Sequence, residues 1–189
     1  MPWFAWLIIA IVVIIVLFFW GSYNGLVRAR LQVKNSWAQI DVQLKRRFDL
    51  IPNLVETVKG YKNFERDTLE AVTKARTAVQ QVPEGNIADR AKAEGDLGAA
   101  LSRLMVVVER YPELKANQNF LALQEELTGT ENRISFSRQA YNDSVQGYNM
   151  KTQGFPSNIV ASMFNFKKEE PFLQATESEA ERQAPKVSF

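Results

Sequence analysis

The 189-residue sequence contains no cysteine and no histidine, and each absence excludes classes of chemistry. Without cysteine the chain forms no disulfide and performs no thiol chemistry. Without histidine it can build neither Ser-His-Asp nor Cys-His catalysis, and neither a zinc finger nor the Glu-x-x-His ligands of di-iron bundles. We therefore predict no catalytic residues, no metal site and no bound cofactor, and we interpret the protein as not an enzyme.

A large excess of charge of one sign is also missing. The chain has 23 basic and 21 acidic residues, which give a formal net charge of +2 at pH 7. Nucleic-acid-binding proteins usually carry a strong basic excess on one face, so we expect no nucleic-acid partner. The alternating β-branched pattern of strands is absent as well, and no repeat of fixed period is visible. The sequence therefore predicts an all-α protein.

One long apolar run stands out against these absences. Residues 3–20 read WFAWLIIAIVVIIVLFFW and contain no charged side chain. As a helix this run would reach roughly 27 Å, close to the thickness of a bilayer hydrocarbon core. Aromatic residues at both ends are typical of the two membrane interfaces. We predict a transmembrane anchor at residues 1–22, with the membrane-spanning positions Trp3, Trp6, Ile11, Phe18 and Trp20.

Two other interpretations of this run are less favoured. A cleaved signal peptide would carry a positive charge before the run and small residues at the cleavage site. Here Met1-Pro2 has no side-chain charge, and Phe18-Phe19-Trp20 fits a cleavage site poorly. A buried helix of a soluble core would not need to be apolar on all sides over this length.

Basic residues follow the apolar run but do not precede it. Arg28, Arg30 and Lys34 lie just after it. The positive-inside rule therefore predicts a single-pass protein of the cytoplasmic membrane, with its N-terminus outside and its long C-terminal part in the cytoplasm. The alternative orientation places that part in the periplasm or outside the cell.

The rest of the chain shows apolar stripes of helical period. We expect helices at about 23–47, 49–82, 88–110 and 113–150, joined by short turns, and this pattern favours a long antiparallel, up-down-up-down four-helix bundle over residues 23–152. Asp49 could cap a new helix with Pro52 in its first turn, so we favour a break there. A single helix kinked through Pro52 is the alternative. Small residues at 95–100 would let a neighbouring helix approach closely.

The C-terminal region divides into two parts. Gly154-Phe155-Pro156 should end the last long helix, and Ser157 could cap a short element at 158–164. We interpret residues 153–172 as a docking segment, because they combine aromatic residues with Lys167 and Lys168. Residues 173–189 are polar and are predicted to be a disordered tail.

Two groups of residues are candidates for interaction. Lys45, Arg46 and Arg47 could bind an anionic partner, such as acidic lipid headgroups or a carboxylate surface, or could simply be solvated charges near a helix C-terminus. Inside a bundle, Glu126 or Glu131 could pair with Arg46 or Arg47, which would fix helix register. The second group comprises Phe155, Phe164, Phe166 and Phe172. These aromatic side chains could dock onto a partner subunit, onto a headgroup layer or onto the protein's own bundle.

A Tyr-Asn pair occurs twice, seven residues apart, at 141–142 and 148–149. Both pairs fall on one face of the predicted last helix. We expect the tyrosines to pack in the core and the asparagines to bond across to a neighbouring helix. Ligand recognition by the same residues is the alternative.

Several strings carry a resemblance to a known family. They are YNGLV (23–27), SWAQIDVQLKRR (36–47), DLIPNLVETVKGY (49–61), YPELKAN (111–117) and LQEELTGTENRI (123–134). In the order and the residues of these motifs, the chain resembles the LemA family of bacterial membrane proteins over roughly residues 1–172. The resemblance implies one N-terminal transmembrane helix followed by an antiparallel helical bundle, and it implies no defined biochemical activity. One departure is Phe64, where relatives often have histidine, so no proton or metal role of that histidine can operate here.

These observations predict a membrane-anchored, non-enzymatic helical scaffold or adaptor of LemA type. Its expected partners are the lipid bilayer, further copies of the same chain and other membrane proteins. The alternative is a ligand- or cation-sensing helical bundle that signals to another membrane protein.

Overall fold

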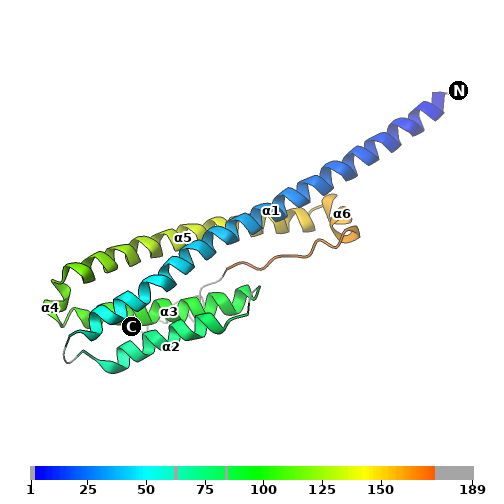
Figure 1. Cartoon of the computed structure of the whole chain (residues 1–189). Coiled ribbons are helices and arrows are strands. Elements are labelled where there is room, and N and C mark those ends of the chain that lie inside the picture. Colours follow the sequence, from blue (N-terminus) through cyan, green and yellow to red (C-terminus); the bar gives the residue numbers. More distant parts are fainter. Residues whose placement is uncertain (1–2, 62–63, 84, 173–189) are drawn as a thin grey trace, which may run out of the picture. The chain divides into compact units, whose positions relative to one another are not determined.

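The computed structural model describes residues 3–61, 64–83 and 85–172 (Figure 1). These residues form helices and no strand, which confirms the all-α class. The helices are α1 Trp3–Lys59, α2 Arg66–Gln81, α3 Ile87–Val108, α4 Pro112–Lys115, α5 Gln118–Gln153 and α6 Ser157–Met163. The predicted disordered tail at 173–189 and the first two residues of the predicted anchor lie outside the described residues.

The chain divides into two compact units. Among the described residues, the first unit consists of 3–39 and 139–171, and the second consists of 40–61, 64–83, 85–138 and Phe172. Helices α1 and α5 each contribute residues to both units.

The apolar run forms the beginning of α1, and its side chains are not covered by protein. This helix contains a segment long and apolar enough to cross a membrane, and none of that segment is buried. A core helix of a soluble domain would be mostly buried, so the buried-helix interpretation does not fit. The helix also shows no interruption at residue 22, where the predicted anchor ends.

The predicted helix break at Asp49–Pro52 is wrong, because α1 continues through Pro52 to Lys59. Proline lacks the N–H that would bond to the carbonyl of Phe48, four residues earlier. In the structure, the Arg76 Nε of α2 donates to that carbonyl at 3.4 Å, and the guanidinium carbon lies 3.8 Å from the centre of the Phe48 ring. The lost backbone bond is therefore replaced by a side chain.

Helix α1 ends at Lys59 and α2 begins at Arg66, so the expected single helix at about 49–82 is wrong, and its first part belongs to α1. After Lys59 the Tyr61 N–H donates to the Val58 carbonyl at 3.1 Å, which closes the last turn of α1. The end of α2 at Gln81 and the whole of α3 agree with the prediction. The Asn86 side chain caps α3 by accepting from the Asp89 N–H at 3.1 Å.

The predicted fourth helix is interrupted, which corrects the expectation of one helix over about 113–150. The short helix α4 ends at Lys115, and α5 begins at Gln118. Asn117 explains the restart, because its side-chain oxygen accepts from the Phe120 N–H at 3.1 Å and caps α5. Its amide nitrogen also donates to the Tyr61 hydroxyl at 2.8 Å, which fixes the cap within the second unit.

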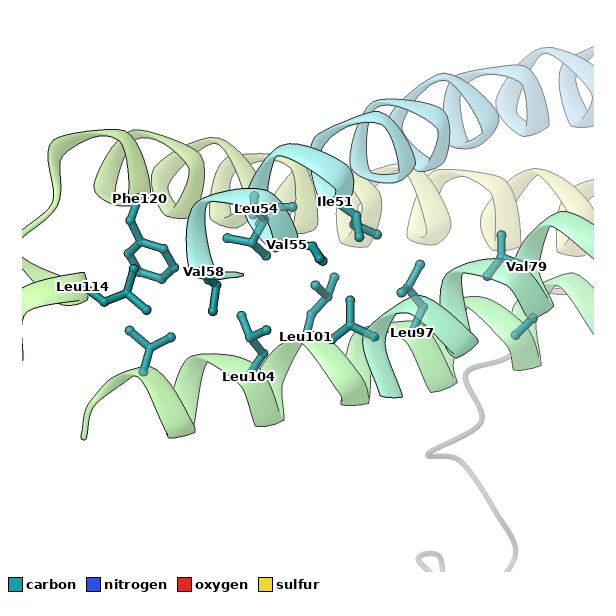
Figure 2. Close-up of a cluster of buried hydrophobic side chains, with 14 residues drawn as sticks. Ile51, Leu54, Val55, Val58, Val79, Leu97, Leu101, Leu104, Leu114 and Phe120 are labelled. Carbon is teal, nitrogen blue, oxygen red and sulfur yellow. The ribbon is translucent and has the colours of Figure 1, made fainter. Parts of the chain in front are cut away.

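The core of the second unit draws on five helices (Figure 2). It combines the end of α1 with α2, α3, α4 and the beginning of α5. Its buried residues include Ile51, Leu54, Val58, Val72, Val79, Leu97, Leu101, Leu104, Leu114, Phe120 and Leu127. Burying each of the larger side chains contributes about 1.5–3 kcal/mol, so this cluster is the main source of stability of the second unit.

The first unit has a smaller apolar cluster around α6. Leu26 of α1 is buried against Val160 and Ala161 of α6, and Phe18, Phe19 and Phe166 pack around them. The predicted short element at 158–164 therefore forms, one residue earlier than expected. Ser157 does not cap it, because the cap position is occupied by Pro156 and the Ser157 hydroxyl donates to the carbonyls of Lys151 and Gly154.

Candidate functional site

The predicted membrane-spanning residues lie along the exposed beginning of α1. Trp3, Trp6, Ile11 and Trp20 are exposed. Phe18 is only half-exposed, because it packs with Phe19 against the cluster of α6.

The basic cluster at 45–47 is split by the helix. Successive residues of a helix point about 100° apart, so three neighbours cannot share one face. Lys45 and Arg46 are exposed, whereas Arg47 is 3 % exposed. The three residues therefore do not form a common anionic site, and Arg47 has a separate environment.

Arg46 forms a surface ion pair. Its Nη2 donates to Glu126 Oε1 at 2.5 Å, and both side chains are 45 % exposed. Pairs in such solvated positions contribute about 0.2–1 kcal/mol.

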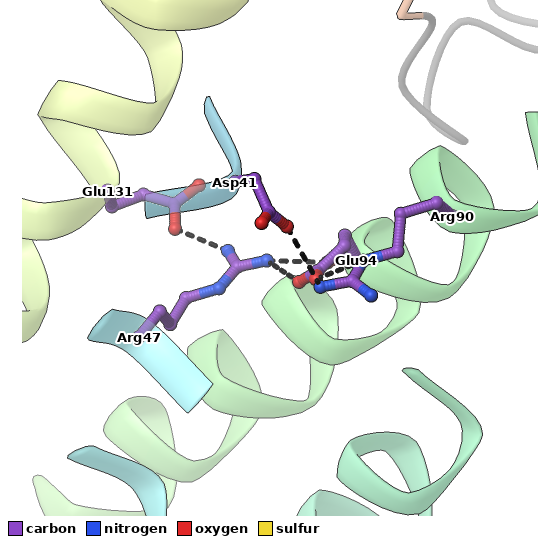
Figure 3. A network of polar contacts seen from close by, with 5 residues as sticks. All are labelled: Asp41, Arg47, Arg90, Glu94 and Glu131. Atoms are coloured by element: carbon purple, nitrogen blue, oxygen red, sulfur yellow. Dashed lines mark hydrogen bonds and ion pairs between the residues drawn. The ribbon is translucent and has the colours of Figure 1, made fainter. Parts of the chain in front are cut away.

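Arg47 lies at the centre of a polar network in the second unit (Figure 3). Its Nη2 donates to Glu94 Oε2 at 2.6 Å and to the Glu94 carbonyl at 3.2 Å, while its Nη1 donates to Glu131 Oε2 at 2.6 Å. The other oxygen of Glu94 accepts from Arg90 Nε at 2.9 Å, and Arg90 lies 4.0 Å from Asp41. The network thus connects α1, α3 and α5.

The two central residues of this network, Arg47 and Glu94, are buried. Arg47 and Glu94 are 3 % and 4 % exposed, so each loses most of its hydration and depends on the other for compensation. Both carboxylate oxygens of Glu94 already accept hydrogen bonds. The arrangement therefore fixes the register of three helices. The predicted pairing of Arg47 with Glu131 is therefore confirmed, whereas Arg46 and Glu126 pair on the surface and not inside the unit.

The sequence interpretation missed Glu94, although the sequence contains a signal for it. Glu94 lies three and seven residues before Leu97 and Leu101, on the apolar stripe of α3. A carboxylate on such a stripe needs a buried cationic partner. The i,i+4 spacing from Arg90 to Glu94 is a second indication.

A cavity of about 380 Å³ adjoins the network in the second unit. Small residues of α3 line one side of it, namely Gly95, Gly98 and Ala99. This is the face that was predicted to allow the close approach of a neighbour, and a Cβ on Gly98 would lie 3.8 Å from Arg47 Nη1. Across the described residues, no group of three or more acidic side chains is placed to hold a metal ion.

The four candidate phenylalanines have different environments. In the first unit, Phe155 and Phe164 are exposed, while Phe166 is half-buried. The Tyr23 ring contacts those of Phe164 and Phe166, with centroid distances of 4.8 and 5.8 Å. Phe172 belongs to the second unit, where it is buried and has the Arg138 guanidinium 5.3 Å from its ring centre.

The docking segment is held on its own chain by three side chains of α5, which we call the α5 clamp: Tyr141, Tyr148 and Asn149. The two hydroxyls donate to the carbonyls of Glu170 and Lys167 at 3.0 and 2.8 Å. The Asn149 amide donates to the Glu169 carbonyl at 2.9 Å and accepts from the Glu169 N–H at 3.0 Å. Asn149 was expected to bond to a neighbouring helix, and this is wrong: its partner is a non-helical segment.

Burial changes the acidity of both clamp tyrosines. Loss of hydration, together with the nearby charges of Glu169 and Glu170, raises the pKa of Tyr141 to about 12. Burial also raises the pKa of Tyr148, with Arg30 opposing and Glu169 adding to the effect. Both hydroxyls therefore remain hydrogen-bond donors at neutral pH.

Comparison with known proteins identifies the family. The sequence profile described as the LemA family matches residues 36–189. The chain belongs to the LemA family. The matched region of this LemA-family chain begins at Ser36, so it includes the Arg47 network and the α5 clamp and follows the apolar run.

Curated relatives of the LemA-family chain agree with this assignment. Protein LemA of Metamycoplasma hominis is 27 % identical over 141 residues, which cover 75 % of this chain and 64 % of the relative. Magnetosome protein MamQ 2 of Paramagnetospirillum magneticum is 25 % identical over 176 residues, covering 80 % and 65 %. Magnetosome protein MamQ of Magnetospirillum gryphiswaldense is 26 % identical over 174 residues, covering 79 % and 64 %. The chain thus spans slightly less than two thirds of the length of these relatives.

Proposed function

We propose that this LemA-family chain is a membrane-anchored, non-enzymatic helical scaffold that self-associates at the cytoplasmic membrane and presents its second unit to other membrane proteins. One observation carries the proposal. Helix α1 runs without interruption from the exposed apolar run at 3–20 to the core residues Ile51–Val58 of the second unit. Helix α1 thus contains both the candidate anchor and part of the packed core of the proposed scaffold.

The arrangement of buried charge supports a structural role. Arg47 and Arg90 both donate to Glu94, and Arg47 also donates to Glu131 of α5. General acid-base catalysis needs a titratable group within reach of a substrate, and Glu94 already accepts bonds on both oxygens. The short connections after α1 and α2 further support an up-down-up-down, antiparallel four-helix bundle as the body of the scaffold.

The proposed orientation depends on charge. Arg28, Arg30 and Lys34 follow the apolar run on α1, and such residues favour the cytoplasmic side of a membrane. We therefore place the second unit in the cytoplasm. The alternative is a second unit in the periplasm or outside the cell, and protease protection in sealed membranes separates the two.

Exposed apolar side chains support self-association. In the second unit, Val42 and Phe136 are both exposed, and Phe136 is 74 % exposed. An exposed phenylalanine on a long helix is a suitable anchor for a neighbouring copy, because aromatic residues dominate the energetics of protein interfaces.

Light scattering in mild detergent tests this proposal. We expect the full chain to have a protein mass of more than one copy, and Phe136→Ser to lower that mass. Asn132→Ser is the matched control, because Asn132 is an exposed polar residue of the same helix. A strictly monomeric wild-type chain would contradict self-association.

The cavity beside Arg47 favours a second candidate function, a ligand- or cation-sensing bundle. Arg47 Nε is buried and has no hydrogen-bond partner among the described residues, so a small ligand could supply an acceptor. Isothermal titration of the full chain with Mg²⁺ and Ca²⁺ tests the cation form of this candidate. Absence of heat at high protein concentration would rule out the cation-sensing form of this candidate.

A further inference from the structure

We propose that α6 and its flanks form a second lipid-contacting element, which lies in the interfacial layer of the bilayer beside α1. The element consists of Phe155, Ile159, Met163 and Phe164, and we call it the interfacial wedge. This inference rests on the proposed function, because it requires residues 3–20 of α1 to cross the bilayer.

Helix α6 has one covered face and one uncovered apolar face. Val160 and Ala161 are buried against α1. The wedge residues are exposed: Phe155 by 84 %, Ile159 by 44 %, Met163 by 65 % and Phe164 by 54 %. Ile159 and Met163 are four residues apart, so they share a face of α6. Four large apolar side chains within ten residues are more than the scattered exposure of a water-facing surface.

Contacts within the first unit fix the level of α6 along α1. Its buried residues pack on Leu26 together with Phe18 and Phe19, and the Phe164 ring lies 4.8 Å from that of Tyr23. Helix α6 therefore lies beside residues 18–26, where the apolar run ends. Leu26 lies about 9 Å beyond Trp20 along the helix, and one headgroup layer is roughly 5–8 Å thick, so the cluster at residues 18–26 covers the level of that layer.

This level identifies the partner as lipid. The described residues contain one candidate membrane span, so within one copy of the chain lipid surrounds that helix on every side. Any side chain at the level of residues 18–26 that protein does not cover must then meet the headgroup layer, whichever way it points. Trp20 and Tyr23 are both exposed and add interfacial aromatic residues at the same level.

The charges next to the wedge are balanced. Lys167 and Lys168 are exposed and precede Glu169 and Glu170. The α5 clamp holds the backbone of three of these residues, so the charges stay close to α6. With no net charge in this stretch, burial of apolar area drives the contact and anionic lipid is not required.

Site-directed spin labelling of the full chain tests the wedge. The sequence contains no cysteine, so each introduced cysteine is unique. The variants are Ile159→Cys and Met163→Cys, with Ile14→Cys as the reference for the span and Val106→Cys as the matched exposed apolar control in the second unit. Each labelled protein is reconstituted in phosphatidylcholine vesicles. The measurement is the ratio of nitroxide collisions with oxygen to collisions with a water-soluble nickel chelate, and circular dichroism checks that helix content is unchanged.

We expect the ratio at residues 159 and 163 to be roughly three-fold or more above that at Val106, and below that at Ile14. A ratio equal to that at Val106, with Ile14 in the bilayer, would overturn the wedge and leave the anchor intact. Low collision rates with both reagents at residues 159 and 163 would also overturn it, because they would show coverage by protein. A water-like ratio at Ile14 would overturn the proposed function and the wedge together.

Discussion

Single residues show where charge has a structural role in this protein. Arg46 and Arg47 are neighbours in the sequence, yet one ion pair is solvated and the other is buried. Because the desolvation cost of a buried charge is met only by its partner, the two pairs respond differently to loss of a carboxylate.

Glu94→Gln is expected to lower the free energy of unfolding by about 3 kcal/mol, because it leaves Arg47 and Arg90 with a neutral partner in a buried site. Glu126→Gln is the matched control, and we expect it to cost less than about 1 kcal/mol. Chemical denaturation in mild detergent, followed by circular dichroism, measures both. Equal effects of the two variants would contradict a structural role for the buried network.

The raised pKa of Tyr141 makes the free energy of unfolding depend on pH in the alkaline range. In the unfolded chain its hydroxyl loses the proton near pH 10.0, whereas in the folded chain the pKa is about 12. The unfolded chain therefore binds fewer protons in this window. The contribution of Tyr141 to stability is complete below pH 10 and is lost as the pH rises toward 12.

Denaturation at a series of pH values from 9 upward measures this effect. We expect the free energy of unfolding to fall more steeply with pH in the wild-type chain than in Tyr141→Phe, which has no hydroxyl to titrate. Tyr148 remains in both proteins and contributes a change of the same sign. Parallel curves for the two proteins would show that Tyr141 titrates normally.

At the scale of the elements, most helices could be predicted and most errors lay at their ends. The sequence pattern located α3 and the end of α2, and turn residues located the end of α5. The break predicted at Pro52 failed because the replacement donor, Arg76, comes from another helix 28 residues away. No local pattern at residues 49–52 contains that information.

The α4–α5 boundary is a different kind of error. Asn117 is a common capping residue with an N–H acceptor in its side chain, so the restart of the helix was visible in principle. The continuous apolar spacing of the region instead favours one uninterrupted helix. At the site, the pairing of Arg47 with Glu131 could be predicted from the positions of the charged residues in the sequence. The role of Glu94 is indicated only by its position on the apolar stripe of α3.

The link between Arg76 and Pro52 can be tested by a double-mutant cycle. Arg76→Ala should destabilise the chain by about 1–2 kcal/mol, because the Phe48 carbonyl loses its donor and the ring loses its cation contact. In a Pro52→Ala background residue 52 has an N–H for that carbonyl, so we expect a smaller loss. Lys74→Ala, an exposed change on the same helix, is the control. Strict additivity would mean that Arg76 does not compensate for the proline.

At the scale of the whole molecule, one chain contains both an exposed apolar helical segment and a packed helical core. The composition predicted the absence of strands and the apolar run. The matched family profile supports the assignment of residues 36–189. Binding of partners to the second unit would depend on exposed apolar residues such as Phe136. The apolar pattern of the sequence alone does not show that Phe136 is exposed.

Alkaline carbonate washing of native membranes, followed by intact mass measurement of the retained protein, tests the central claim most directly. We expect the protein to stay in the membrane pellet and its mass to include residues 3–20. Release of the protein into the wash, or a mature chain that starts near Tyr23, would contradict an anchor that is kept and crosses the lipid.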